Sequence, residues 1–288
     1  MKINTLYNTG KPVFSLEIFP PKKTTAVDAL YHALDTLADL KPDYISVTYG
    51  AGGGQAGNQT CALASYIKHS LHIEPLAHLT CVNTTRQQLL DTIADLRDHD
   101  IENILALRGD ITPTATLCEE VAHASDLARL IGQQSGFHIA GACYPEGHFE
   151  SPSLDADIQN LHQKIDAGAA QLITQLFFDN TKFYTFQEKL AAADIHVPVS
   201  AGIMPIVTTK QLERTLTLSG ASLPVEFTHM VGRYANNSQA LYHAGIAYAI
   251  EQIQQLLEHG VDGIHLYTMN NPQVAQDIYN GIREELGR

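Results

Sequence analysis

Residues 13–21 read VFSLEIFPP and carry the pattern from which the architecture can be inferred. The run begins with β-branched and aliphatic residues, as a buried strand does, and then places a carboxylate at Glu17. Because Glu17 alternates with Leu16 and Ile18, its side chain is expected on the opposite face of the strand. Burying an unpaired charge is costly, so such a residue adds nothing to strand stability. Glu17 is therefore predicted to have a function at the mouth of the fold.

The same order of apolar run, polar end and helical segment recurs along the chain. Strand-like runs lie at residues 13–19, 44–47, 76–80, 104–107, 138–143, 172–177, 199–203 and 263–267. Helical periodicity marks residues 26–40, 85–98, 118–132, 154–168 and 240–260. This alternation predicts an α/β fold of the (β/α)8 TIM-barrel type. The longer interval before the last run leaves room for an extra helical segment around residues 210–218.

An open, doubly wound parallel sheet is the alternative fold, because it also alternates strands with helices. Its dinucleotide sites need a G-x-G-x-x-G turn after a strand. The glycine-rich segment at residues 50–54, GAGGG, lacks that spacing and has no well-placed acid for a ribose behind it. The sequence therefore favours the barrel, with residues 50–54 as a loop.

Composition limits the class of protein. The 288 residues are 44% hydrophobic and 17% charged, and no linker divides them, so a single domain over residues 1–288 is expected. Short apolar stretches and a polar N-terminus favour a cytoplasmic protein. A net charge of −13 argues against nucleic acid as a partner. The cysteines lack C-x-x-C spacing and are expected to be free thiols: Cys61, Cys81, Cys118 and Cys143.

The active site of a barrel lies at the carboxyl ends of its strands. The residues at these ends are Glu17, Thr48, Tyr49, His78, Thr80, Arg108, Gly109, Asp110, Tyr144, Gln175, Met204, Pro205 and Tyr267. A set this polar, converging on one face, is hard to explain by packing.

The residue types at three of these strand ends indicate particular chemistry. In a partly apolar site Glu17 is expected to have a raised pKa and to donate a proton near neutral pH. Gly109 would let a ligand approach the backbone between Arg108 and Asp110, although a simple ion pair of those two residues is the alternative. His78 is equally compatible with a hydrogen-bonded core histidine.

Several mechanisms lack the residues they need. No strand ends in a lysine and no G-x-S-x-G turn occurs, which counts against covalent catalysis. Neither an HExxH motif nor paired histidines at the strand ends are found, so no metal site is predicted. The remaining proton donor, cation, amides and aromatic rings suit a bound organic cofactor.

Seven motifs in chain order give the sequence a family resemblance. They are SLEIFPP (15–21), VTYGA (47–51), HLTC (78–81), ALRGD (106–110), YPE (144–146), KIDAGA (164–169) and TQLFFD (174–179). Together they resemble methylenetetrahydrofolate reductase of the bacterial type that consists of the catalytic domain alone.

The resemblance implies an FAD-dependent barrel enzyme that takes hydride from NADH or NADPH and then reduces methylenetetrahydrofolate to methyltetrahydrofolate by ping-pong kinetics. It implies that Glu17 is the general acid that helps open the methylene bridge. Asp110 would tune the flavin and contact the folate, Gln175 would bind the stacked substrate, and Gln211 would contact the folate. The implied cofactor contacts are Thr48, Tyr49, Ala51, His78, Arg108, Gly109, Asp110, Ala124, Tyr144, His148, Asp157, Asn160 and Lys164.

Three positions depart from the family pattern. An arginine-bearing segment is replaced by the neutral residues 57–60, GNQT. An aromatic residue that covers the substrates in some members falls near Thr215 or Leu216, and an arginine that meets the glutamate tail of the folate falls at Asn271.

Two other functions stay open at this stage. One is a flavin-free barrel lyase that uses Glu17 and Asp110 as acid and base, and the other is a flavin- or folate-binding protein without catalysis. No acid or arginine that would read the ribose distinguishes NADH from NADPH. The resemblance implies a homo-oligomer, commonly a tetramer.

Overall fold

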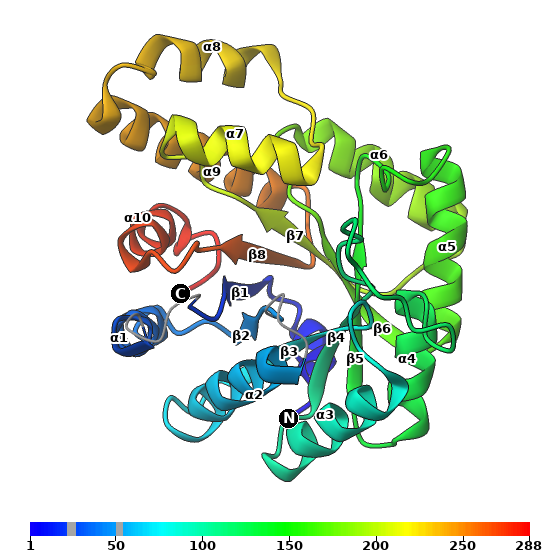
Figure 1. The fold of residues 1–288 in the computed structure, drawn as a ribbon. Helices are drawn as coiled ribbons and strands as arrows, with labels where there is room; N and C mark the ends of the chain where they lie inside the picture. Colours follow the sequence, from blue (N-terminus) through cyan, green and yellow to red (C-terminus); the bar gives the residue numbers. More distant parts are fainter. Residues whose placement is uncertain (22–26, 50–53) are drawn as a thin grey trace.

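The computed structural model describes residues 1–21, 27–49 and 54–288, except for the side chains of residues 54–58 and 218. Within these residues, parallel strands pair in chain order and the last strand pairs with the first, so the sheet closes into a barrel (Figure 1). The strands are β1 (Val13–Ile18), β2 (Tyr44–Val47), β3 (Glu74–Thr80), β4 (Asn103–Leu107), β5 (His138–Cys143), β6 (Ala169–Thr174), β7 (Val199–Ile203) and β8 (Gly263–Tyr267). The predicted barrel is confirmed, and the open sheet is wrong.

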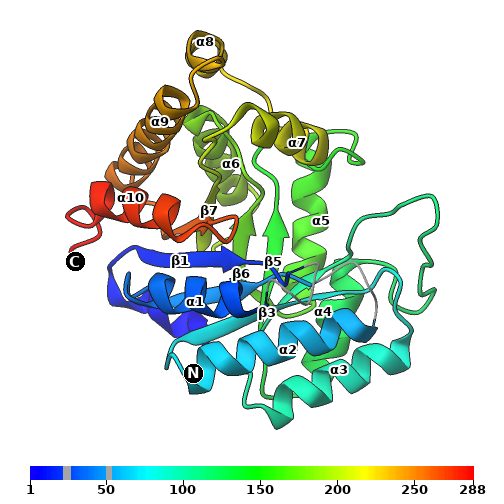
Figure 2. The same cartoon turned by 60° about the vertical axis from the view of Figure 1, so that its left-hand side comes forward.

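Helices surround the barrel (Figures 1 and 2). They are α1 (Val27–Ala38), α2 (Gly54–His69), α3 (Arg86–Asp98), α4 (Ala124–Gln133), α5 (Leu154–Asp166), α6 (Asn180–Ala192), α7 (Thr209–Ser219), α8 (Val225–Tyr234), α9 (Ser238–Glu258) and α10 (Pro272–Ile282). The helices α7, α8 and α9 lie between β7 and β8, which confirms the extra helical segment. Helix α8 packs on α9 at the periphery (Figure 2).

Two predicted elements have a boundary that differs from the structure by more than two residues, α4 and β6. Helix α4 begins at Ala124 rather than at residue 118, because His123 is its N-cap and donates its backbone N–H to the Asp126 carboxylate. Strand β6 covers Ala169–Thr174 rather than residues 172–177. The apolar residues Leu176 and Phe178 misled the prediction, since they pack against α8 after the strand has ended.

Alternation along the strands sorts side chains between two cores. On β1, Phe14, Leu16 and Ile18 are fully buried in the large core between the barrel and its helices. Ser15 and Glu17 point the other way, into the barrel, as the alternation predicted. The barrel interior therefore receives the polar residues of this strand.

The amino-terminal end of the barrel is closed by a 3₁₀ helix, η1 (Ile3–Thr9). An inner apolar cluster lies at this end and comprises Ile3, Val13, Tyr44, Leu76, Leu105, Ala140 and Ile173. Polar side chains lie among them in what we call the floor network, formed by Tyr7, Tyr44, His138, Gln171 and Ser200. Gln171 donates to the hydroxyls of Tyr7 and Tyr44 and accepts from His138 Nε2 over 3.1 Å. Tyr7 and Ser200 share a hydrogen bond of 2.7 Å.

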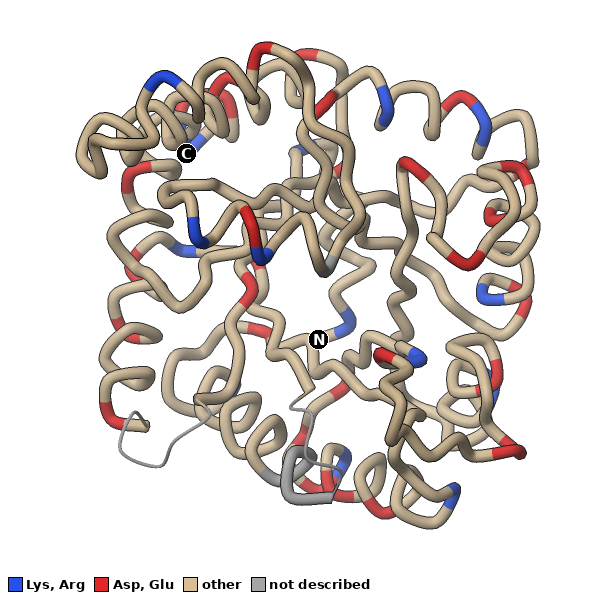
Figure 3. The backbone as a smooth tube through the Cα atoms, turned by 45° about the horizontal axis from the view of Figure 1, so that its top comes forward, with Lys and Arg blue, Asp and Glu red and all other residues tan. Residues whose placement is uncertain are grey.

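The outer surface carries more acidic than basic residues. Over the described residues, Lys and Arg positions are dispersed around the helices among more numerous Asp and Glu positions (Figure 3). Because acidic residues dominate, any anionic ligand must be held by cations placed locally.

Among the described residues, no helix is both long and apolar enough to cross a membrane.

Candidate active site

Three strands bring polar side chains to one oxygen of the Glu17 carboxylate. Nε2 of His265, on β8, lies 3.3 Å from Oε2 of Glu17. The Ser46 hydroxyl, on β2, donates to the same oxygen over 3.4 Å, and Nε2 of His78, on β3, lies 3.6 Å from it. The register explains the meeting, because Glu17 stands opposite Ser46 on one neighbouring strand and opposite Tyr267 on the other. We call Glu17, Ser46, His78 and His265 the acid cluster.

The pKa of Glu17 is shifted in the direction opposite to the sequence prediction. Burial raises this pKa, but the hydrogen bond from His265, the charges of His78 and His265 and the hydrogen bond from Ser46 outweigh burial, and the pKa lies below the ordinary value. Burial lowers the pKa of His78 to about 4, so this imidazole is neutral near pH 7. The hydrogen bonds from His265 and Ser46 therefore account for much of the effect at neutral pH. The prediction failed because the strand pattern reveals burial but not the donors on other strands.

His265 was not identified from the sequence. It is fully buried, and its second ring nitrogen, Nδ1, lies 2.8 Å from the Ser15 hydroxyl. The ring stacks on Tyr44 with centroids 6.2 Å apart and meets the edge of Tyr267 at 5.4 Å. The alternation of His265 and Tyr267 with Ile264 and Leu266 could have revealed its inward direction, as it did for Glu17.

The loop after β4 presents Arg108, Gly109 and Asp110. Arg108 forms a bidentate pair with Glu150, with N–O distances of 2.6 and 3.0 Å, so the alternative of an Arg108–Asp110 pair is wrong. Asp110 is exposed at this loop. Gly109 has a φ of 89°, and a Cβ there would lie 3.2 Å from Cβ of Thr80, so a side chain is disfavoured by both conformation and space.

The segment after β5 carries most of the other expected cofactor contacts. The rings of Tyr144 and His148 meet edge to face at 4.8 Å. Asp157, buried on α5, accepts from the backbone N–H of His148 and from the Ser151 hydroxyl. Lys164 lies on the same helix and donates to the Ala142 carbonyl over 2.8 Å. These contacts hold the loop to α5.

The remaining expected contacts also follow strand ends or begin helices. Thr48 directly follows β2 and donates its backbone N–H to Ile18, while Tyr49 is half-buried beside it. Ala124 is the first residue of α4, and Asn160 is exposed on α5. Gln175 directly follows β6 and donates its backbone N–H to Cys143 over 2.7 Å. Ala51 lies outside the described residues.

The expected folate contact Gln211 and the positions that depart from the family pattern lie in structural contacts. The side-chain amide of Gln211 donates to the Pro205 carbonyl and accepts from Val207, so it fixes the loop after β7. Asn271 is the N-cap of α10 and accepts from the N–H of Val274. Thr215 is buried on α7 and Leu216 is half-buried. Thr60 donates to the Thr48 carbonyl, which ties α2 to the end of β2.

The donors around the barrel mouth fit an anionic, hydrogen-bonding cofactor such as a flavin. Among the described residues, Nε2 of His78 is a buried nitrogen without a hydrogen-bond partner. Burial lowers the pKa of Lys164, whose ammonium lies 6.0 Å from the centroid of the Tyr144 ring. A bound anion beside Lys164 would favour its charged form, and a ligand atom beside His78 would complete its hydrogen bonding.

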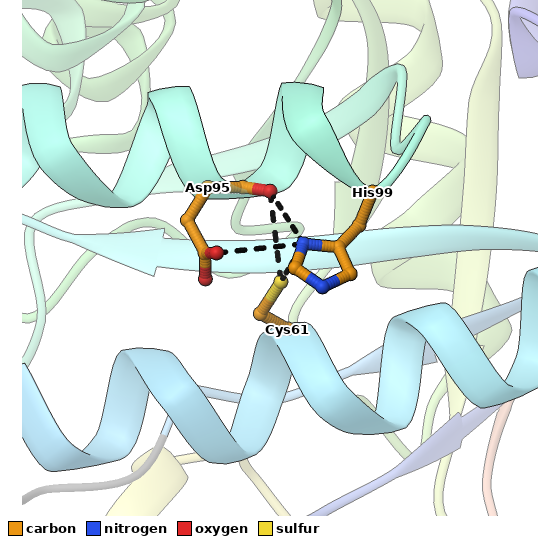
Figure 4. A group of neighbouring side chains, drawn as sticks. All are labelled: Cys61, Asp95 and His99. Carbon is orange, nitrogen blue, oxygen red and sulfur yellow. Dashed lines mark hydrogen bonds and ion pairs between the residues drawn. The ribbon is translucent and has the colours of Figure 1, made fainter.

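A second cluster of chemically active side chains lies outside the barrel (Figure 4). Cys61 on α2 and Asp95 and His99 at the end of α3 place three potential ligand atoms within 4.8 Å of one another. However, Nδ1 of His99 lies 2.8 Å from the Asp95 carbonyl and 3.5 Å from the Cys61 sulfur. Burial raises the pKa of the Cys61 thiol to about 12. The cluster is accounted for as a hydrogen-bonded contact between α2 and the end of α3.

The fold and the site together define a (β/α)8 enzyme with its acid–base groups at the carboxyl ends of the strands. The family model described as methylenetetrahydrofolate reductase matches residues 2–283, and the chain belongs to this family.

Two relatives agree with this assignment, and a solved structure shares the fold. A 5,10-methylenetetrahydrofolate reductase of Pectobacterium carotovorum is 34% identical over 97% of this chain and 93% of its own. Methylenetetrahydrofolate reductase (NADH) 1 of Arabidopsis thaliana is 34% identical over 96% of this chain and 49% of its own. A Clostridium thermocellum protein that binds two copies of 5-methyl-5,6,7,8-tetrahydrofolic acid shares the fold, with a TM-score of 0.64, 13% identity and full coverage of both chains.

Proposed function

We propose that this chain catalyses the FAD-dependent reduction of 5,10-methylenetetrahydrofolate to 5-methyltetrahydrofolate, with NADH or NADPH as the electron donor. The observation that carries the proposal is the acid cluster, in which a buried carboxylate at the carboxyl end of β1 is surrounded by donors from β2, β3 and β8. Family membership supports reduction of methylenetetrahydrofolate. A relative named for NADH favours that donor over NADPH.

Some residues of the chain bind the cofactor and the substrates, and Glu17 transfers the proton. The flavin, when bound, supplies the route by which an electron pair passes from the nicotinamide to the folate. Arg108 and Lys164 supply positive charge for its pyrophosphate, and Asp157 accepts from a ribose hydroxyl. Arg108 must exchange part of its pairing with Glu150 for this contact. Thr48 lies beside the nicotinamide in this scheme.

Glu17 protonates the folate nitrogen that leaves as the methylene bridge opens, which produces the iminium carbon that accepts hydride. Asp110 and Gln175 hold the pterin ring, and Asp110 also tunes the flavin. Gln211 contacts the folate at the loop after β7. Nicotinamide and folate would each react with the bound flavin in turn, so the kinetics would be ping-pong.

We also propose a domain organisation and an oligomeric state for the chain. Residues 1–288 act as one catalytic domain, and copies of the chain assemble into a homo-oligomer, a tetramer by family resemblance. Because Asn271 is committed to capping α10, the glutamate tail of the folate is held by other residues.

The test is an absorbance spectrum of the purified protein, followed by anaerobic addition of NADH and then of methylenetetrahydrofolate. A yellow protein that bleaches with NADH and regains its colour with the folate supports the proposal. A colourless protein that stays inert after FAD is added would favour the flavin-free lyase. A yellow protein that performs neither step would favour a binding protein without catalysis.

A further inference from the structure

We propose that Glu17 and His265 hold the catalytic proton as a pair, with His265 as a positioning residue that passes this proton to Glu17 for each folate turnover. This inference rests on the proposed function and deepens it. The ionised state favoured for Glu17 in the free protein creates the need, because an ionised carboxylate must be reloaded before it can act as an acid.

The hydrogen bonds of His265 allow its proton to move. Nε2 faces Glu17 at 3.3 Å, and Nδ1 faces the Ser15 hydroxyl at 2.8 Å. The Ser15 hydroxyl also lies 3.3 Å from the Ile264 carbonyl. When Ser15 donates to that carbonyl, its oxygen accepts from Nδ1–H, and when Ser15 donates to Nδ1, the ring carries its proton on Nε2.

Both positions of the proton are therefore satisfied inside the barrel. With a proton on each ring nitrogen, His265 donates to Ser15 and to the Glu17 carboxylate. With the proton on Glu17 instead, Nε2 accepts from the carboxyl group while Nδ1–H still donates to Ser15. Neither state leaves an unpaired nitrogen on His265, so moving the proton does not carry the cost of a buried polar group without a partner.

The surroundings hold the imidazole in place for this transfer. His265 is fully buried, its ring is stacked on Tyr44 and contacts Tyr267, and Ser46 lies 3.4 Å from Nε2. A side chain that is this confined keeps Nε2 aimed at Glu17 without loss of rotamer entropy during turnover.

The other titratable groups facing the pair are neutral near pH 7. From β3, His78 faces Glu17, and burial lowers its pKa to about 4. From β8, Tyr267 faces both members, and burial raises its pKa well above the ordinary value. From β2, burial raises the pKa of Tyr44, which stacks on His265. Of the described imidazoles facing Glu17, His265 is the one with a hydrogen-bond partner at each ring nitrogen.

The proton balance of the folate step is complete. The O–H bond of Glu17 breaks as an N–H bond forms on the folate, and the electron pair of the broken C–N bond stays on that nitrogen. Nε2–H of His265 transfers to the Glu17 carboxylate before this step, so the pair holds one proton until the folate takes it. When the product leaves, solvent returns one proton to the pair at Glu17, whose side chain is 18% exposed, whereas that of His265 is fully buried. The nicotinamide half-reaction moves a hydride and draws no proton from this pair.

The test compares His265→Gln with His138→Gln in the flavin-loaded protein. Glutamine at 265 keeps an N–H donor for Glu17 but cannot release or accept a proton near neutral pH. His138 is a buried imidazole of the same barrel that bonds Gln171 in the floor network, so its replacement is the matched control. Both half-reactions are followed by stopped-flow absorbance between pH 6 and 9.

We expect His265→Gln to slow flavin reoxidation by methylenetetrahydrofolate about 100-fold and to change the pH profile of that step. Flavin reduction by NADH should stay within about two-fold of wild type, and His138→Gln should leave both steps unchanged. An unaltered rate and pH profile in His265→Gln would overturn the pairing while leaving the proposed function intact. A wild-type protein that performs neither half-reaction would overturn both.

A second variant covers the case in which His265→Gln does not fold. Ser15→Ala removes the partner of Nδ1 and leaves Glu17 and His265 in place. It should shift the pH profile of the folate step and leave flavin reduction unchanged. If Ser15→Ala reproduces the wild-type profile of the folate step, the assigned role of His265 is wrong.

Discussion

The two ends of the barrel interior both bury histidines, but they treat them differently. In the floor network, His138 bonds Gln171, which in turn holds Tyr7 and Tyr44, so each side chain has a neutral partner. In the acid cluster, the donors converge on one carboxylate oxygen and Nε2 of His78 is left without a hydrogen bond. Buried polarity alone therefore does not mark a functional site. A buried carboxylate beside an imidazole nitrogen that has no partner does.

The largest effect should follow replacement of the acid itself. Glu17→Gln keeps the size of the side chain but removes the proton, so the folate half-reaction should fall at least about 100-fold while NADH still reduces the flavin. Stopped-flow absorbance of both half-reactions measures this. Asp262→Asn, which removes a carboxylate at the amino ends of the strands, is the matched control and should leave both steps unchanged. Loss of both half-reactions in Glu17→Gln with flavin still bound would contradict the assigned role.

The stability of the protein should depend on pH through His78. Its pKa is lowered from 6.5 to about 4, so between these values the unfolded chain binds a proton that the folded chain does not. The contribution of the neutral His78 to the free energy of unfolding is fully present above pH 6.5, and it is lost as the pH falls toward 4. At about 1.4 kcal/mol per pKa unit, the full loss is about 3 kcal/mol.

Urea unfolding at several pH values tests this expectation. The free energy of unfolding of wild type should fall between pH 6.5 and 4.5 more steeply than that of His78→Gln. Equal slopes in the two proteins would show that the buried imidazole is not responsible.

Disrupting the floor network should affect stability but not catalysis. Gln171→Leu leaves the hydroxyls of Tyr7 and Tyr44 and the imidazole of His138 without their amide partner, which should cost about 2 kcal/mol. Chemical denaturation measures the cost, with the exposed Gln163→Leu as control. The network meets the acid cluster where Tyr44 stacks on His265, and because Gln171→Leu keeps that ring, both half-reactions should be retained. A selective defect in the folate step would mean that the two ends of the interior are coupled.

The smallest effect is expected at the barrel rim. In the proposed flavin complex Glu150 would compete with the pyrophosphate for Arg108, and a solvent-accessible ion pair is worth at most about 1 kcal/mol. Glu150→Gln should therefore tighten flavin binding by no more than about five-fold, as measured by quenching of flavin fluorescence. Glu146→Gln removes a carboxylate of the same loop that accepts from Ser222 instead, and it should leave the affinity unchanged. Weaker flavin binding in Glu150→Gln would argue that Glu150 positions Arg108 for the cofactor.

The sequence predicted what local patterns encode and missed what distant strands assemble. The barrel and the direction of Glu17 follow from strand–helix alternation and period-two patterning, which are local. The predicted direction of the pKa shift of Glu17 was wrong, because the hydrogen-bond donors that lower this pKa, Ser46 and His265, lie on other strands. The partner of Arg108 was missed for the same reason, since Glu150 belongs to a later loop.

The pairing of β1 with β8 joins the two ends of the chain, and it places His265 248 residues beyond Glu17. A polypeptide that stops before β8 would contain the loops after β2, β4 and β5 but not this imidazole. Under the proposed pairing of Glu17 and His265, folate turnover therefore requires that β8 has closed the barrel.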